Sequence, residues 1–228
     1  MTTLPEATTT GSTDRSAGRA AITSGVFGIM AIGFLIVAVA NMLKSNPDIS
    51  GFVNLMFKAH HVGVILQSLF MIHVAFGLPT LASRRFPSVS RATLAVGVVS
   101  LSAIVLCALL FLVNVVADDL YTVPQGVLGV WLMVVSQRLA SVLPRGLTWF
   151  GTVVGFGLLL VGTFPLAYAS FVDPIGLHGP VPPDYPNPET TANAIIHDVF
   201  FVGTVMGVWT YPIWTILLGG RLLRARGF

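Results

Sequence analysis

Residues 21–43 read AITSGVFGIMAIGFLIVAVANML, an apolar run without a charged side chain. About 20 mostly apolar residues in a helix are enough to cross the hydrocarbon core of a bilayer. Five more segments have this character, and the weakest of them is 124–142, because Gln125, Gln137 and Arg138 interrupt it. The chain is therefore predicted to be all-α, a polytopic membrane bundle of six transmembrane helices at about 21–43, 52–82, 92–117, 124–142, 146–170 and 194–218.

The composition of the 228-residue chain excludes an ordinary soluble domain and a disordered protein. Hydrophobic residues make up 54% of it and charged residues only 9%, whereas soluble domains contain about 25% charged residues. The mean hydropathy is +0.85. The net charge of +3 comes without any run of lysine and arginine, so no nucleic acid is expected as a partner. The partner that the composition indicates is the lipid bilayer.

Basic residues predict the orientation, because cytoplasmic loops of membrane proteins carry an excess of lysine and arginine. With the N-terminus inside, all ten arginines fall on the cytoplasmic side, and Lys44 and Lys58 fall on the other side. Both termini are therefore expected in the cytoplasm, with the protein as a multi-pass component of the cell (inner) membrane. Residues 1–20 are polar and are expected to be a disordered cytoplasmic tail before a transmembrane domain at 21–223.

One connection differs from the others: residues 171–193 contain six prolines and link the fifth and sixth predicted spans on the extracytoplasmic side. Proline has no amide hydrogen and disfavours helix, so extended backbone is expected there. Connections longer than about 12–15 residues without regular structure are often functional lids. The alternatives for this loop are a lid over a site and a passive bridge between distant helix ends.

The second predicted span carries polar residues on two faces. Lys58 and His61 share one helical face, whereas His60 and Gln67 share another. Ionisable residues at membrane depth are costly and are candidates for functional sites by default. A helix that is polar on two faces is expected to be buried among neighbouring helices rather than exposed to lipid.

Polar groups on three predicted spans gather near the extracytoplasmic surface. His61 lies near the start of the second span, His197 and Asp198 open the sixth, and Asp118 follows the third. Because groups at one depth can satisfy each other, these four are the predicted catalytic residues, in one cavity roofed by 171–193. Histidine suits proton transfer near neutral pH. The alternative is that each side chain reaches outward to headgroups and water on its own.

The same histidines define the hypothesis of a bound metal. His60, His61 and His197 are the candidate metal ligands, and His60 or His61 opposite His197 would be the axial pair that a haem requires. The single cysteine, Cys107, excludes a Cys-based metal motif within one chain, and no HExxH signature occurs. The identity of a cofactor is left undetermined by these residues.

Two stretches resemble segments of known sequences: LPRGLTWFGTVVGFGLLLVG at 143–162 and PIWTILLGGRLL at 212–223. They are similar to uncharacterised bacterial multi-helix inner-membrane proteins of about six spans. In those proteins an LPR-type turn leads into a glycine-rich helix, and a final helix ends in a basic tail. The resemblance covers about a fifth of the chain. It implies a bacterial inner-membrane protein of this topology and implies no activity.

Three functions are compatible with these residues. The first is a membrane-embedded enzyme of cyclase or isomerase type, acting on a lipidic or isoprenoid substrate by acid–base or metal-assisted chemistry at His61 and His197. The second is a small transporter or permease subunit, for which a homodimer with a central path would fit. The third is a haem-binding redox subunit. The polar residues alone leave all three open.

Overall fold

The computed structural model describes residues 9–42, 50–83, 90–174, 188 and 190–224, and every regular element in these ranges is helical. The predicted all-α class is confirmed for this part of the chain. In chain order, the elements are α1 (Thr9–Met42), α2 (Ser50–Ser83), α3 (Arg91–Leu112), η2 (Asp118–Tyr121), α4 (Thr122–Arg138), α5 (Arg145–Phe171), α6 (Thr191–Gly203), η4 (Thr204–Val208) and α7 (Tyr211–Arg224).

The helices have the length and the apolarity of membrane spans. The fourth helix, α4, has 17 residues and is shorter than the others that cross the bundle, as the interrupted run at 124–142 indicates. The chain is therefore a multi-pass membrane helix bundle. Among the described residues, five stretches are long and apolar enough to cross a membrane: Arg15–Met42, Ser50–Leu78, Arg91–Leu112, Arg145–Phe171 and Thr191–Arg224, the last of which contains α6, η4 and α7.

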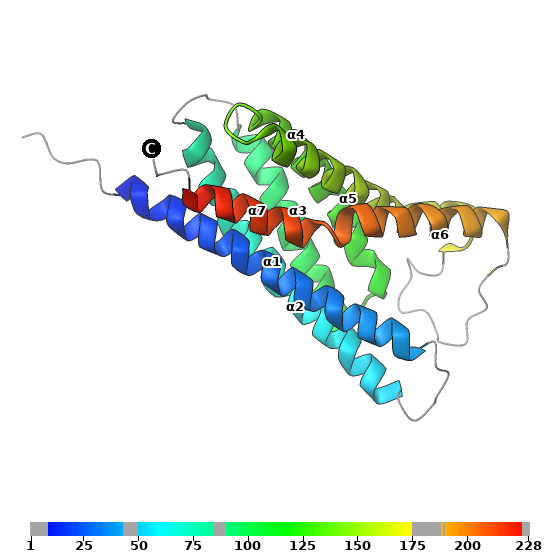
Figure 1. Ribbon diagram of the computed structural model, residues 1–228. Coiled ribbons are helices and arrows are strands. Elements are labelled where there is room, and N and C mark those ends of the chain that lie inside the picture. Colours follow the sequence, from blue (N-terminus) through cyan, green and yellow to red (C-terminus); the bar gives the residue numbers. More distant parts are fainter. Residues whose placement is uncertain (1–8, 43–49, 84–89, 175–187, 189, 225–228) are drawn as a thin grey trace, which may run out of the picture.

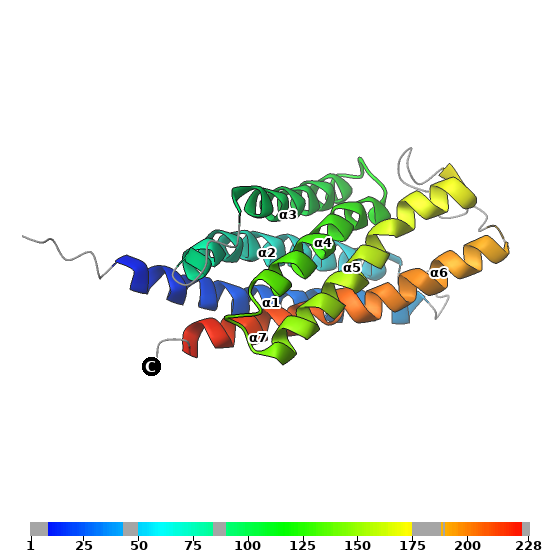
Figure 2. The same cartoon turned by 90° about the horizontal axis from the view of Figure 1, so that it is seen from above.

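Helices that follow one another in the sequence pack on one another and close into a ring (Figure 1 and Figure 2). In this order, α1 packs on α2, α2 on α3, α3 on α4, α4 on α5 and α5 on α6. The ring closes where α7 packs along α1, as Figure 1 shows. In Figure 2, α3 and α7 lie on opposite sides of the bundle with α1 and α2 between them. The apolar core inside this ring includes Met71, Leu101, Leu132, Leu158 and Leu218.

The first helix begins earlier than its polar sequence predicts. Residues 9–20 are helical rather than a disordered tail, because α1 already begins at Thr9. Small residues explain the difference: Ala17 is 1% exposed and packs on α2, and Gly18 lets α7 approach α1 closely. Packing of this kind contributes more to helix stability than the propensities of single residues. Residues 1–8 lie outside the described part of the chain.

The third helix ends earlier than predicted, at Leu112 rather than at Ala117. The chain turns at Asn114, whose φ of 58° lies in the left-handed region, and asparagine adopts this region more readily than most residues. The next regular element is η2, which begins at Asp118. The predicted site residue Asp118 therefore belongs to a separate short helix and not to the end of the third span.

The sixth span is broken near its middle, between α6 and α7. Its π-helical segment η4 is followed by a turn, and α7 starts at Tyr211. The amide of Trp209 donates to the carbonyl of Thr204, five residues back, at 3.0 Å, which is the π-helical pattern. Pro212 contributes to the break because it has no amide hydrogen for the carbonyl four residues before it. The span is thus two helices joined at mid-length.

The arginines of the described residues gather at one end of the bundle, where α1 begins and α7 ends (Figure 1). At this end, Gly18 of α1 lies against Leu223 of α7, and Gly146 of α5 lines a groove together with Arg221 of α7. The beginning of α1 and the end of α7 therefore lie on the same side. The described arginines are Arg15, Arg19, Arg91, Arg138, Arg145, Arg221 and Arg224.

Candidate functional site

A small cavity whose wall is partly polar lies inside the ring, near the middle of the helices. Its volume is about 30 Å³, and α1 to α5, η2 and the broken sixth span all contribute to its wall. Two lining residues, Gln67 and Leu158, stand at the midpoints of α2 and α5. Val208 and Tyr211 line the cavity from the two sides of the break in the sixth span. The cavity is therefore far from both ends of the bundle.

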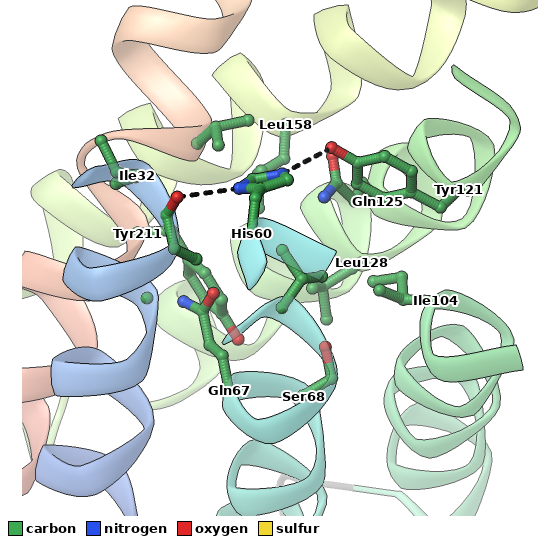
Figure 3. Close-up of a pocket in the computed structure, with 14 residues that line it drawn as sticks. Ile32, His60, Gln67, Ser68, Ile104, Tyr121, Gln125, Leu128, Leu158 and Tyr211 are labelled. Atoms are coloured by element: carbon green, nitrogen blue, oxygen red, sulfur yellow. Dashed lines mark hydrogen bonds between the residues drawn. The ribbon is translucent and has the colours of Figure 1, made fainter. Parts of the chain in front are cut away.

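His60 uses both ring nitrogens at the edge of this cavity (Figure 3). Its side chain is 2% exposed. Nδ1 lies 2.9 Å from the carbonyl oxygen of Ala31, and because a carbonyl oxygen only accepts, Nδ1 carries a hydrogen and donates it. In the neutral ring Nε2 is then an acceptor, and the hydroxyl of Tyr121 donates to it at 3.3 Å. These bonds join α1, α2 and η2 around the cavity.

Three further residues that line the cavity each have a buried polar atom without a hydrogen-bond partner: Nε2 of Gln67, Oε1 of Gln125 and the hydroxyl oxygen of Tyr211. They come from α2, α4 and α7, and Figure 3 shows their side chains arranged around His60. A buried polar group that makes no hydrogen bond costs roughly 1–3 kcal/mol. A cavity of about 30 Å³ has room for one or two water-sized groups.

Gly28 of α1 makes room for this arrangement. A Cβ at this position would lie 2.5 Å from Nε2 of Gln67 and 2.6 Å from Cγ of Pro212, closer than van der Waals contact. A residue without a side chain is therefore required for the amide of Gln67 and the start of α7 to approach α1 here. Gly28 thus determines how closely α2 and the broken span approach α1 at the cavity.

His61 follows His60 in the sequence but belongs to an aromatic cluster beside the cavity. Its side chain is fully buried, with 0% exposure. Nδ1 donates to the carbonyl oxygen of Phe57 at 2.8 Å. The ring stacks on Phe111 with centroids 4.1 Å apart, and it meets Tyr121 edge-on at 5.3 Å. His61 therefore connects α2 with the end of α3 and with η2.

His197 and Asp198 lie on α6, and both side chains are exposed. The ring of His197 contacts Phe164 at 5.3 Å and Tyr168 at 6.2 Å, both on α5. Within the described residues, the ring contacts of His61 and of His197 have no residue in common. The structure therefore places the two predicted catalytic histidines in different surroundings.

Two elements of the predicted site remain, namely Asp118 and the proline-rich loop, and the structure describes only some of their residues. Asp118 lies in η2, the short helix whose last residue, Tyr121, contacts both His60 and His61. The structure thus brings the element that contains Asp118 to the histidines of α2. Most of the proline-rich loop that was expected to roof the site, residues 175–187 and 189, lies outside the described residues.

The histidines do not form a metal-ligand group in the part of the chain that the structure describes. No three His, Cys, Asp or Glu side chains there lie close enough together to hold a metal ion. The rings of His60 and His61 have centroids 5.1 Å apart and planes at 87°, and both Nδ1 atoms point to backbone carbonyls. A haem would need His197 opposite one of them, and the ring contacts of His197 are with Phe164 and Tyr168 of α5.

Part of the cavity has a signal in the sequence. His60 and Gln67, seven residues apart, form the second polar face of α2, and both are buried as a two-faced polar helix predicts. Gln125 has a weak signal, because it interrupts an apolar run. Tyr211 has none, since a tyrosine within an apolar span is ordinary. The spacing of residues in the sequence therefore does not predict that these side chains line one cavity.

Comparisons with protein-family models, with curated proteins and with solved structures found no match to this chain. The similarity of 143–162 and 212–223 to bacterial inner-membrane proteins therefore stays a prediction. The function has to be inferred from the geometry of the cavity and from the bundle around it.

Proposed function

We propose that this chain is a small transporter that binds a small neutral polar solute in the mid-span cavity. The observation that carries the proposal is that three residues lining one cavity in the middle of a membrane bundle, Gln67, Gln125 and Tyr211, each have a buried polar atom without a partner. Polar groups inside membrane proteins usually face substrate pathways or water-filled cavities. A bound solute would supply the missing hydrogen bonds.

The chemistry of the wall favours a neutral solute. Within the described part of the chain, the lining residues include no Lys, Arg, Asp or Glu, and their polar groups are amides, hydroxyls and an imidazole. A charged solute would lack a counter-charge there, and an uncompensated buried charge costs far more than an unpaired neutral group. Because the cavity is only about 30 Å³, the solute belongs among the smallest hydrogen-bonding molecules, such as water, urea or a short alcohol.

The broken span beside the cavity supports the same proposal. Many secondary transporters place their binding site near the bilayer midplane, next to a discontinuous helix. In this chain, η4 and the turn before Tyr211 interrupt the sixth span beside the cavity, and Val208 and Tyr211 line it. A π-helical segment within a helix is frequently found at functional sites. The break provides a place where the cavity wall can move while the rest of the span stays helical.

A membrane-embedded acid–base enzyme is the second candidate, and the hydrogen bond between His60 and Tyr121 favours it. An imidazole and a phenol hydroxyl in contact can move a proton at the edge of the cavity. The catalytic groups would then be His60 and Tyr121 rather than a site shared by His61 and His197. A lipidic or isoprenoid substrate would require a cavity much larger than about 30 Å³, which places this candidate second.

For the membrane topology, we propose six spans, with α4 as the short fourth one, and both termini in the cytoplasm of a bacterial inner membrane. The gathering of the described arginines at one end supports this orientation. In a Cys107→Ser background, Asp184→Cys should react with a membrane-impermeant maleimide in intact cells. Ser88→Cys should react only after the cells are opened. The reverse pattern of labelling would refute the orientation.

Transport is tested by stopped-flow light scattering of proteoliposomes, with water, urea and glycerol as probes. The wild-type chain should raise the permeability to at least one probe above that of protein-free liposomes. The Gln67→Leu variant should reduce the permeability due to the protein about tenfold, because a lost hydrogen bond to the solute costs about 1–1.5 kcal/mol. The variant should remain folded, since leucine replaces a polar group that has no partner in the cavity wall.

The matched control for this experiment is Gln137→Leu. Gln137 is an exposed residue of α4 that is not among the residues lining the cavity, so this variant should transport at the wild-type rate. Wild-type permeability equal to that of empty liposomes for all three probes would contradict the proposal. Full activity of Gln67→Leu would show that the solute does not pass through this cavity.

A further inference from the structure

A second hollow lies at the arginine-rich end of the bundle, between the beginning of α5 and the end of α7. Its volume is about 570 Å³, within the range of about 300–1,000 Å³ that ligand pockets occupy. Leu147 and Phe150 of α5 and Ile216 and Leu217 of α7 supply its apolar floor. This groove shares no lining residue with the mid-span cavity.

The rim of the groove is cationic. Arg221 and Arg224 line it from α7, three residues apart on one side of the helix, and both side chains are exposed. Arg145, the first residue of α5, stands directly before the lining residue Gly146. The described residues that line the groove include no Asp or Glu, so the guanidinium groups favour an anion that comes from outside the protein.

The groove is cationic at the end of the bundle and apolar deeper in the span. This is the order in which a bilayer presents headgroups and then hydrocarbon. Trp149, one helical turn from Arg145, is 71% exposed, and exposed tryptophans concentrate where headgroups meet hydrocarbon. Ile216 and Leu217 lie about one turn deeper in the span than Arg221. A molecule in the groove would therefore meet cations at headgroup level and an apolar surface below them.

From these features we infer that the groove binds one anionic phospholipid molecule. Its phosphate lies against Arg221 and Arg224, and an acyl chain lies along Leu147 and Phe150. Guanidinium groups pair with phosphate oxygens through two parallel hydrogen bonds, and basic pockets between membrane helices attract anionic lipids. A zwitterionic lipid carries the same phosphate, but its own ammonium group offsets the charge. The groove should therefore prefer an anionic headgroup.

Native mass spectrometry of the purified full-length chain in detergent tests this inference. The probes are dioleoylphosphatidylglycerol, which is anionic, and dioleoylphosphatidylcholine, which is zwitterionic. One phosphatidylglycerol molecule per chain should bind about tenfold more tightly than phosphatidylcholine. The double variant Arg221→Gln, Arg224→Gln should lose this preference, and the exposure of both side chains predicts that it folds. The preference of the wild-type chain for phosphatidylglycerol over phosphatidylcholine tests the inference even if the double variant does not fold.

Two further variants separate lipid binding from general attraction of anions. Arg15→Gln combined with Arg19→Gln is the matched control, because these exposed arginines lie at the same end on α1 and do not line the groove. It should bind phosphatidylglycerol as the wild type does. Leu217→Ser keeps the charges and should weaken phosphatidylglycerol binding. Equal binding of the two lipids, an equal loss in the control, or displacement of phosphatidylglycerol by millimolar inorganic phosphate would overturn the inference.

Discussion

Gly162→Leu is expected to keep α4 and α5 from packing and to lower the free energy of unfolding by about 3 kcal/mol. The backbones of the two helices touch at this point, because a Cβ on Gly162 would overlap the backbone of Gly126. The nearest atoms are backbone atoms rather than a side chain that could turn away, so the helices would have to separate. Fluorescence-detected gel filtration of detergent extracts measures the folded, monodisperse fraction, which should fall sharply.

Gly33→Leu is the matched control. Gly33 also lies within a helix, but nothing stands within 4 Å of the Cβ that it would carry. Leucine is a better helix former than glycine by up to about 1 kcal/mol, so this variant should be unchanged or slightly more stable. Gly162→Ala should also destabilise the protein and Gly33→Ala should not, with a smaller difference between the two variants than for leucine. Similar melting temperatures for Gly162→Leu and Gly33→Leu would contradict the close contact of α4 and α5.

His60→Ala is expected to lower the free energy of unfolding by about 2–4 kcal/mol. The substitution removes a side chain that is 2% exposed, enlarges the cavity, and breaks the hydrogen bonds to Ala31 and Tyr121. Circular dichroism of the detergent-solubilised protein during thermal unfolding measures the loss. His73→Ala provides the comparison, because His73 is exposed and bonds only at 3.2 Å to Ser16, and it should change stability by less than about 0.5 kcal/mol.

Tyr121→Phe separates the hydrogen bond from the packing of His60. It removes only the hydroxyl that donates to Nε2 of His60, so a loss of about 1 kcal/mol is expected. In a double-mutant cycle, His60→Ala and Tyr121→Phe should be coupled by about 0.5–1.5 kcal/mol. Additive effects of the two substitutions would show that the pair does not interact in the folded protein.

The positions of the spans could be predicted because length and apolarity are properties of a local run of sequence. For example, α5 at Arg145–Phe171 agrees with the predicted 146–170 to within one residue at each end. The end of α3 could not be predicted in this way. The turn after Leu112 depends on a left-handed Asn114, which interrupts no pattern of apolar residues.

Which helices pack on one another could not be predicted from the depth of their residues in the membrane alone. The hypothesis of a site shared by His61 and His197 relied on their similar distance from the membrane surface, and depth does not say which helices touch. In the ring, α2 packs on α1 and α3, whereas α6 packs on α5 and η4. The cavity instead joins Gln67, Gln125 and Tyr211, which are far apart in the sequence and come together only through helix packing.

The contact between the first and the last helix has a consequence for how the protein is made. Chains emerge from the ribosome N-terminus first, so α1 is inserted long before α7 is synthesised. Until then, Gly18 and Gly25 lack the neighbours that face them in the folded protein, because the atoms nearest to both glycines belong to α7. The contact also joins nearly opposite ends of the sequence, a kind of closure that slows folding. Completion of the core therefore awaits the synthesis of α7.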